Sequence, residues 1–587
     1  MNQKSEPYQT AQQATALADD HRFTRSITFR LKSLLLSQQR KIKNVRDGIQ
    51  RFDQNHRFLL APVLSTSESE LWNRDDNDMN RWLTAGKVEN LRKAVAHLHG
   101  IEIPANAVFS FWKHIGKPSR SKGFVVGREI REGCIIPTIA GGICQLSNAL
   151  YDAALKAGFE IHERHRHSKI IKGSLAEQGR DATVKWNYID LRFSSKQDFR
   201  IEAELTSNQL RITFKGLEKN EVTDVATTPM VSSTLNDCFS CGNVSCHQHP
   251  GKLPLPMTRV KTTCLLDERW PEYEDYLQTI LKDGDMVITP STWIKTPARY
   301  IWQTGEGVVN KHVIATTIGR AIKMRRANSR GENIFEQSIS SDHLVAEAMA
   351  TMIPIDSTHL IISQNLLPGL WKSGQLGGRT WDVLMNRLPI QHLQHQLDFA
   401  FALHPQSKTL KDFRASSQLV YIENTALNRA SKIITPHTAI AQIFNHKSIL
   451  LPWKMPSVSP RLSRGKKILF PSSALARKGA IEMKKLAVEL QLEIIYTGLT
   501  EEYPRFWDGV TATYHSKPPL DEIVCVVYPA YVEHQPRVLL RALSAGIPVV
   551  TSRSCGIPPM QQLFLFEKGD YSAMKNLVSQ ILRANEL

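Results

Sequence analysis

The sequence of 587 residues predicts a multidomain protein, with an α+β domain followed by two doubly wound α/β domains. Three observations carry this prediction. The chain is too long for one ordinary domain, and about three are expected. Up to about residue 215, apolar and polar residues alternate over short runs, which is typical of half-buried strands. Beyond residue 258, short apolar runs alternate with helical patterns, which predicts parallel sheets covered by helices.

The composition excludes a disordered chain. Hydrophobic residues make up 42% of the sequence, which includes 11 Trp and 21 Phe, enough to build several cores. The formal net charge is +18 and the isoelectric point is about 9.5. This balance favours acidic partners such as nucleotides, phosphates or anionic lipid headgroups, although a solvated basic surface would also produce it. Nucleic acid is the weakest candidate because basic and aromatic residues are not interleaved.

The N-terminal segment has no apolar core like that of a signal peptide, and no stretch approaches the roughly 20 apolar residues of a spanning helix. We therefore expect a cytoplasmic protein with reduced thiols. Residues 21–46 are basic and amphipathic, with Phe23, Ile27 and Leu31 on one helical face. Two interpretations stay open: a helix docked on its own domain, or peripheral contact with anionic lipid at the inner face of the cytoplasmic membrane.

The segment GGICQLSNALY (141–151) raises the first functional question. Gly141 and Gly142 permit a sharp turn or a close backbone approach. Leu146 and Leu150 then recur at helical spacing, and Gly158 suits a helix C-terminus. Cys144 is therefore expected near a helix N-terminus, where unpaired N–H groups and the helix dipole favour a thiolate.

Histidines follow this helix in the segment EIHERHRHSK (160–169). His165 or His167 could act as a base for Cys144, and the polar residues Asp181, Asn187 or Asp190 of a later segment could orient the imidazole. Among these, our alternative active site consists of Cys144, His165, His167 and Asp190. Metal or ligand binding by this cluster and a purely structural role both stay open. Residues 182–193 and 201–214 alternate in polarity and predict half-buried, antiparallel strands.

Residues 109–168, with the motifs FSFW, GGICQLSN and ERHRHS, resemble the VanW family, which is named for an accessory protein of a vancomycin-resistance cluster. The resemblance covers roughly residues 80–215. It implies an α+β domain and little mechanism, because the activity of that family is not settled. Ala140 stands where the family commonly has a third glycine.

Cysteine and histidine gather in the segment CFSCGNVSCHQH (238–249). The C-x2-C spacing followed by glycine is a usual knuckle geometry, and further Cys and His residues complete four ligands for tetrahedral zinc. An iron–sulfur cluster and a loop of reduced thiols are the alternatives. The predicted metal ligands are Cys238, Cys241, Cys246, His247 and His249.

The C-terminal part predicts buried parallel strands at 467–473, 493–498, 523–529 and 547–552, with helical patterns between them. The loop VEHQP (532–536) follows one strand and leads into a helix whose N–H groups could hold a diphosphate.

Residues 528–556 resemble the retaining glycosyltransferases built from two Rossmann-like domains in the GT-B arrangement. The resemblance extends over roughly residues 285–580. It implies that Glu533 touches the donor sugar and that Lys478, in a lysine–glycine pair, neutralises the donor diphosphate. The family's second glutamate falls on Arg541, which cannot accept hydrogen bonds from ribose but could meet a phosphate. The expected donor-binding set is Lys478, Arg477, Glu533, His534, Gln535 and Arg541.

The predicted domains are therefore a VanW-like domain (1–235), a metal knuckle with a linker (236–257), and two glycosyltransferase halves (258–455 and 456–587). The expected function is glycosyl transfer from a nucleotide sugar to a glycan or lipid-linked acceptor in cell-envelope or surface-polysaccharide synthesis. Glu533 and Lys478 are the expected catalytic pair. The alternatives are a Cys144-dependent hydrolase or transferase acting on peptidoglycan-type material, and an inactive binding or scaffold protein.

Overall fold

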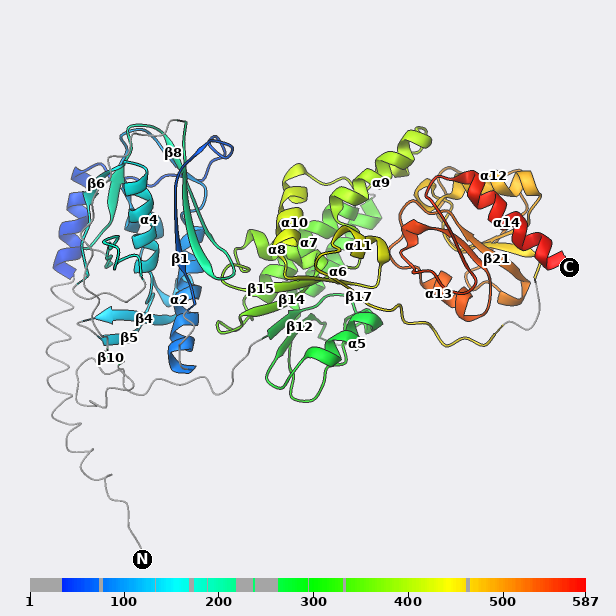
Figure 1. Cartoon of the computed structure of the whole chain (residues 1–587), viewed down its shortest axis with the longest axis horizontal. Coiled ribbons are helices and arrows are strands. Elements are labelled where there is room, and N and C mark those ends of the chain that lie inside the picture. Colours follow the sequence, from blue (N-terminus) through cyan, green and yellow to red (C-terminus); the bar gives the residue numbers. More distant parts are fainter. Residues whose placement is uncertain are drawn as a thin grey trace, which may run out of the picture. The chain divides into compact units, whose positions relative to one another are not determined.

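The computed structural model describes residues 34–72, 78–131, 134–167, 174–186, 188–217, 236–237, 262–293, 295–330, 334–460 and 465–586. The chain separates into two compact units (Figure 1). We call residues 1–259, 354–358 and 374–379 the N-terminal unit. Residues 260–353, 359–373 and 380–587 form the C-terminal unit. None of the described helices is both long and apolar enough to span a lipid bilayer.

The N-terminal unit is α+β, as the sequence predicts. Its three sheets have the strand orders β1-β9-β8-β2, β10-β5-β4 and β3-β7-β6. The strands are β1 (Val63–Glu70), β2 (Ile101–Ile103), β3 (Phe109–Ser110), β4 (Val126–Arg131), β5 (Cys134–Ile139), β6 (Glu160–Glu163), β7 (Arg192–Ser194), β8 (Phe199–Leu205), β9 (Gln209–Lys215) and β10 (Asn236–Asp237). The helices are α2 (Asp78–Ala96), α3 (Phe111–Ile115) and α4 (Cys144–Lys156).

Helix α4 lies in the core of this unit and confirms the predicted helix after the two glycines. It packs against β1 and β9, and its side chains Leu146 and Leu150 are fully buried. Gly158 has a φ of 66°, the left-handed conformation expected of a helix C-terminus.

The prediction of a strand over 182–193 is wrong for most of its length. Only β7 forms there, and Lys185 and Ile189 pair across a tight turn instead. Ala182 and Val184 are buried, and the backbone of Ala182 is bound by the side chains of Ser147 and Asn148 on α4 and not by a neighbouring strand. The second predicted strand, 201–214, is an antiparallel hairpin of β8 and β9.

Residues 34–46 are helical, and Arg40 donates two hydrogen bonds of 2.6 Å to the carboxylate of Glu163. The helix is therefore docked on its own unit. Leu34 and Leu35 nevertheless remain 59% and 67% exposed, so contact with a membrane stays a prediction.

The C-terminal unit contains two parallel sheets, which confirms the prediction of two doubly wound, Rossmann-like domains. The first has seven strands in the order β13-β12-β11-β14-β15-β16-β17. These strands are β11 (Thr262–Leu265), β12 (Met286–Pro290), β13 (Val309–Val313), β14 (His359–Ser363), β15 (Thr380–Leu384), β16 (Lys432–Thr435) and β17 (Ser448–Leu450). The helices are α5 (Pro271–Ile280), α6 (Ala315–Arg330), α7 (Ile334–Ala350), α8 (Leu367–Lys372), α9 (Ile390–Leu403), α10 (Ser417–Arg429) and α11 (Thr438–Ile443).

The second parallel sheet has six strands in the order β20-β19-β18-β21-β22-β23, with helices on both sides (Figure 1). Its strands are β18 (Lys467–Phe470), β19 (Ile494–Tyr496), β20 (Ala512–Tyr514), β21 (Ile523–Tyr528), β22 (Val549–Ser552) and β23 (Leu563–Phe566). The helices are α12 (Ala480–Leu490), α13 (Arg537–Ser544) and α14 (Tyr571–Glu586). Every residue of β21 is buried, which explains why a continuous apolar run marks it.

Candidate functional site

A cavity of about 1300 Å³ lies in the C-terminal unit and is lined by residues of both parallel-sheet domains. Its volume exceeds the 300–1000 Å³ of typical small-molecule pockets, so it has room for more than one small molecule. The lining is rich in cations and includes Lys295, Arg299, Arg320, Arg325, Lys372, Arg387, Arg477 and Lys478. The lining carboxylates are Asp267, Glu268, Asp342 and Glu533.

The topology of the two sheets explains why charged side chains meet in this cavity. In the second sheet the chain runs outward from β18 to one edge and from the neighbouring β21 to the other edge. In the first sheet the chain likewise runs from β11 to one edge, and from its neighbour β14 to the other edge. Such a switch point leaves a crevice at the carboxyl ends of the two strands, where ligands of open α/β sheets bind.

Glu533 follows β21 and has a fully engaged carboxylate. Its Oε2 accepts hydrogen bonds from Lys478 Nζ at 2.8 Å and from the Tyr528 hydroxyl at 2.5 Å. Its Oε1 accepts from the backbone N–H groups of His534 and Gln535, at 2.9 and 2.8 Å. Burial alone would raise the pKa of Glu533, but the Lys478 ammonium and these hydrogen bonds lower it to about 2. Glu533 is therefore an ionised carboxylate held in one position.

Lys478 follows β18 and ends a short helical turn before Gly479. Gly479 has a φ of 78°, and a Cβ there would lie 2.3 Å from the carbonyl oxygen of Pro529. Glycine is thus required for this loop to pack beside the end of β21. The Lys478 ammonium also donates to the carbonyl oxygen of Val532 at 3.3 Å. With two of its three N–H groups in these contacts, one remains for a ligand.

Arg477, the other predicted cation of this loop, lines the cavity. Its guanidinium lies over the ring of Phe413, 5.1 Å from the centroid, and 3.4 Å from Asp412. Burial lowers the pKa of Arg477 and the charge of Asp412 opposes this shift, which leaves the guanidinium charged and partly desolvated.

His534 and Gln535 both line the cavity, but the His534 ring is hydrogen-bonded within the protein and the Gln535 side chain is exposed. The His534 ring accepts a hydrogen bond from the backbone N–H of Leu388 at 3.2 Å. Burial, followed by the charge of nearby His437, lowers the pKa of His534 to about 3. His534 is thus a neutral ring that joins the two parallel-sheet domains. Gln535 has an exposed side chain at the start of α13.

Arg541 is not in the cavity lining, which corrects its placement in the predicted donor-binding set. It lies in α13 with an exposed side chain. A different arginine of the same helix is engaged: Arg537 forms two hydrogen bonds, of 2.6 and 2.7 Å, with the buried carboxylate of Glu272. The Arg537 guanidinium also lies over the rings of Trp270 and Trp453, 5.3 and 5.4 Å from their centroids. This contact joins α13 to α5 across the two domains.

A second group of charged residues, missed by sequence reasoning, lies at the other switch point. Asp267 follows β11 and accepts hydrogen bonds of 2.7 and 2.8 Å from Arg320. Asn365, which follows β14, donates to the same carboxylate at 2.6 Å. Arg320 also reaches Asp342 at 3.0 Å. Burial and then the charge of Asp267 raise the pKa of Asp342 to about 6. The one sequence signal was an acidic residue directly after a buried strand.

In the N-terminal unit, one face of α4 is bound to residues 181–184. Cys144 is the first residue of the helix, and its sulfur lies 3.7 Å from the Thr183 hydroxyl and 3.7 Å from the Val184 carbonyl oxygen. Ser147 donates to the Ala182 carbonyl at 2.5 Å, and the Asn148 side chain accepts from the Ala182 N–H at 2.7 Å. The motif CQLSN therefore places three polar side chains, at positions i, i+3 and i+4, against this segment.

The structure brings His167, but not His165, to Cys144. His167 and the Cys144 thiol each shift the pKa of the other, so the two groups are neighbours, and Nδ1 of His167 lies 2.6 Å from Asp181 Oδ1. His165 instead contacts Glu163 at 3.3 Å.

Asp190 is corrected as a partner for the imidazole. Its carboxylate accepts hydrogen bonds from the Ser110 hydroxyl at 2.6 Å and from Arg192 at 3.0 Å. Because Ser110 is the N-cap residue of α3, Asp190 stabilises the N-terminus of that helix. Asp181 takes the position beside the imidazole. Asn187 lies outside the described residues.

The predicted zinc ligands Cys238, Cys241, Cys246, His247 and His249 lie outside the described residues, so the metal knuckle stays a prediction. Within the described part of the chain, no group of three or more His, Cys, Asp or Glu side chains is arranged to hold a metal ion.

Comparison with known proteins identifies residues 86–215 as a VanW-like domain, since they match the family described as VanW like protein. An uncharacterised protein of Bacillus subtilis (strain 168), YoaR, is 34% identical over 110 residues, which are 18% of this chain and 36% of YoaR. The vancomycin B-type resistance protein VanW of Enterococcus faecalis (strain ATCC 700802 / V583) is 28% identical over 131 residues, 22% of this chain and 47% of that protein. The chain thus spans between a third and a half of the length of these relatives.

Among solved structures, the sucrose-phosphate synthase of Thermosynechococcus elongatus is similar over 56% of this chain and 91% of its own, with 12% identity and a TM-score of 0.37. At that score the similarity supports no conclusion about activity or substrate. The function is therefore inferred from the residues and the cavity of this chain.

Proposed function

We propose that the C-terminal unit is a glycosyltransferase that moves a sugar from a nucleotide-activated donor to a glycan or lipid-linked acceptor in cell-envelope or surface-polysaccharide synthesis. One observation carries the proposal: both switch points of the unit contribute charged residues to one cavity. Such a cavity can hold the two substrates of a group transfer next to each other, each bound by a different domain.

The second parallel-sheet domain would bind the donor. A diphosphate carries the charge that the cationic lining, Lys478 and Arg477 above all, is suited to neutralise. The same cations stabilise the charge that develops on the diphosphate as it leaves. Glu533 is ionised and fixed, so its carboxylate holds the Lys478 ammonium in position to meet the diphosphate.

The first parallel-sheet domain would bind the acceptor. Asp267 and Asp342 both accept hydrogen bonds from Arg320, and carboxylates also accept hydrogen bonds from sugar hydroxyls. Because the pKa of Asp342 is raised to about 6 by burial and by Asp267, this group exchanges a proton near neutral pH. It is therefore suited to proton transfer from an acceptor hydroxyl.

The proposal is tested by a thermal-shift screen of the full chain against nucleoside diphosphates and nucleotide sugars carrying different bases. A ligand bound at 100 times its dissociation constant stabilises the folded state by about 2.7 kcal/mol, which a melting curve resolves. At least one nucleotide sugar should raise the melting temperature, and its nucleoside diphosphate should do so as well. If no nucleotide or nucleotide sugar shifts the transition, the unit is a binding or scaffold module with a transferase fold.

A further inference from the structure

A second cluster of reactive side chains lies in the N-terminal unit and is not used by the proposed transferase. Cys144 begins the 13-residue helix α4, and the residue is half-buried, whereas Cys264, Cys525 and Cys555 are buried. Ser147 and Asn148 of the same helical face already hold the backbone of Ala182 in place. The thiol is therefore not needed to fix this segment.

His167 is oriented toward Cys144 by a buried carboxylate. Asp181 is fully buried, and its two oxygens accept hydrogen bonds from the backbone N–H and from Nδ1 of His167, at 2.5 and 2.6 Å. Because Nδ1 is bound to Asp181, Nε2 is the ring nitrogen that remains for the sulfur of Cys144. Cysteine, histidine and carboxylate thus follow one another in the order that activates a nucleophile.

The charges of the three groups reinforce one another. Burial would lower the pKa of His167, but its bonds to Asp181 and Cys144 raise it to about 10. Burial would likewise raise the pKa of the Cys144 thiol, yet His167 and the contacts with Val184 and Thr183 lower it. By contrast, burial raises the pKa of the enclosed thiols Cys264 and Cys555, the latter to about 12.

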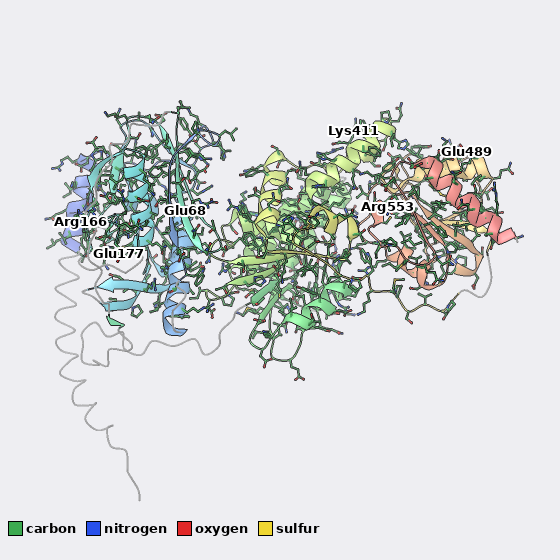
Figure 2. All side chains as sticks on the ribbon, viewed as in Figure 1. Glu68, Arg166, Glu177, Lys411, Glu489 and Arg553 are labelled. Atoms are coloured by element: carbon green, nitrogen blue, oxygen red, sulfur yellow. The ribbon has the colours of Figure 1, made fainter. Side chains whose placement is uncertain are left out.

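The cluster is open to solvent on the side of the histidine. The His167 side chain is 19% exposed, and its neighbour Arg166 lies at the surface (Figure 2). The other charged groups that face the cluster are engaged elsewhere: Arg164 donates to the Asp181 carbonyl oxygen at 2.6 Å, and His165 contacts Glu163. A reagent or substrate can therefore approach the cluster from the side of the charged imidazole.

We propose that Cys144, His167 and Asp181 form a second active site that transfers acyl groups from an amide or ester through a thioester on Cys144. In the first step the sulfur attacks the carbonyl carbon, the S–C bond forms and the bond to the leaving amine or alcohol breaks. His167 gives its proton to that leaving group. His167 next takes a proton from water or from an acceptor amine, which attacks the thioester, and the thiolate leaves as the acid or new amide is released. Asp181 is a positioning residue that holds the imidazole throughout.

The charge state of Cys144 is tested by iodoacetamide alkylation of the full chain across pH 5 to 10, with the modified peptides resolved by mass spectrometry. In the unmodified sequence, the alkylation rate at Cys144 should reach half its maximum at a lower pH than that of an ordinary thiol. His167→Gln should move that midpoint upward by more than one unit, toward the roughly 8.5 of an ordinary thiol. His165→Gln, the matched control, should leave it unchanged. A Cys144 that resists alkylation in the folded chain, or a midpoint that His167→Gln does not move, overturns the proposal.

The acyl transfer itself is tested with p-nitrophenyl acetate and with a peptide amide. The chain should carry an acetyl group on the Cys144 peptide after exposure to the ester, and should release it to water. Cys144→Ser and His167→Gln should each reduce acylation at least tenfold, and Asp181→Asn should shift the pH profile of acylation upward. A thiolate that is alkylated at low pH but accepts no acyl group from either probe would refute the transfer and leave only a reactive thiol.

Discussion

Lys478 and Glu533 meet in the crevice between the two central strands of the second parallel sheet, with 2.8 Å between Nζ and Oε2. Lys478 follows β18 and Glu533 follows β21, and these strands are neighbours. The pair therefore joins a donor of charge-assisted hydrogen bonds and a fixed acceptor at the switch point, where ligands of such sheets bind. Its consequences for stability and for binding can be measured separately.

The first prediction concerns acid. The pKa of Glu533 in the folded chain is about 2, below its usual value of about 4.3 in an unfolded chain. The stability that the ionised group contributes is therefore present above about pH 4.3 and is lost as the pH falls toward 2. Glu533→Gln should lower the melting temperature of the C-terminal unit at pH 7, and lower it less at pH 3.

The matched control for this experiment is Glu567→Gln. Glu567 pairs with Arg553 at 2.8 Å, but the two side chains are 72% and 58% exposed, and Arg553 is at the surface (Figure 2). Exposed pairs contribute about 0–1 kcal/mol, so this variant should have little effect at either pH. An effect of Glu533→Gln that is equal at pH 7 and pH 3 would show that the carboxylate is not held as described.

Arg541 should be dispensable for the donor. Its side chain is exposed and absent from the cavity lining, so Arg541→Ala should change the dissociation constant of a nucleotide sugar by less than about twofold. Arg477→Ala, which removes a cation from the lining, should weaken binding about tenfold, the effect of roughly 1.4 kcal/mol. Both dissociation constants can be measured by calorimetric titration. An equal loss of affinity in the two variants would show that Arg541 does contact the donor.

Arg537 should be essential for the stability of the C-terminal unit. Arg537→Lys loses the bidentate contact with the buried Glu272 and the contact of the guanidinium with two indole rings. We expect a loss of roughly 2–4 kcal/mol, because a buried carboxylate is left poorly paired. Arg541→Lys on the same helix should change stability by less than about 0.5 kcal/mol. Chemical denaturation distinguishes the two, and similar midpoints would contradict the contact.

In the turn before Cys144, substitutions at the adjacent residues Ala140 and Gly141 should affect stability differently. Ala140 has a φ of 61°, in the left-handed region. Ala140→Gly should therefore leave stability unchanged or raise it by up to about 1 kcal/mol. At Gly141 a Cβ would lie 2.3 Å from the carbonyl oxygen of Gly127, so Gly141→Ala should destabilise by about 1–3 kcal/mol. Calorimetry that shows the same sign for both changes would contradict this turn.

The sequence alone could predict some elements of the fold but not others. Strands such as β18, β21 and β22 are buried on both faces, so an uninterrupted apolar run identifies them without further information. The segment 182–191 alternates in polarity as a strand does, but the backbone at its start, Ala182, is bound by the side chains of Ser147 and Asn148. No pattern within the segment itself contains that information.

Some residues of the candidate sites could also be predicted from the sequence, and others could not. Lys478, Glu533 and Cys144 stand in recognisable local motifs, and the structure adds their partners. Asp181 and Asp190 are equally plausible by spacing, and only the fold places Asp181 beside His167. Asp267, Arg320 and Asp342 come from a strand end and two helices, and Glu272 and Arg537 are 265 residues apart. Such contacts depend on tertiary packing, and they cannot be predicted from a local sequence motif.

The most direct test of the proposed transferase is a calorimetric titration of the best nucleotide sugar from the thermal-shift screen into the full chain and into Lys478→Met. Lys485→Met is the control, since that lysine lies on α12 with a side chain 60% exposed. Removing a charged hydrogen bond to the diphosphate costs about 1.5–3 kcal/mol. The dissociation constant should therefore rise roughly 10- to 100-fold in Lys478→Met and stay unchanged in Lys485→Met. A nucleotide sugar that binds the Lys478→Met variant as tightly as the unmodified chain would contradict the donor site described here.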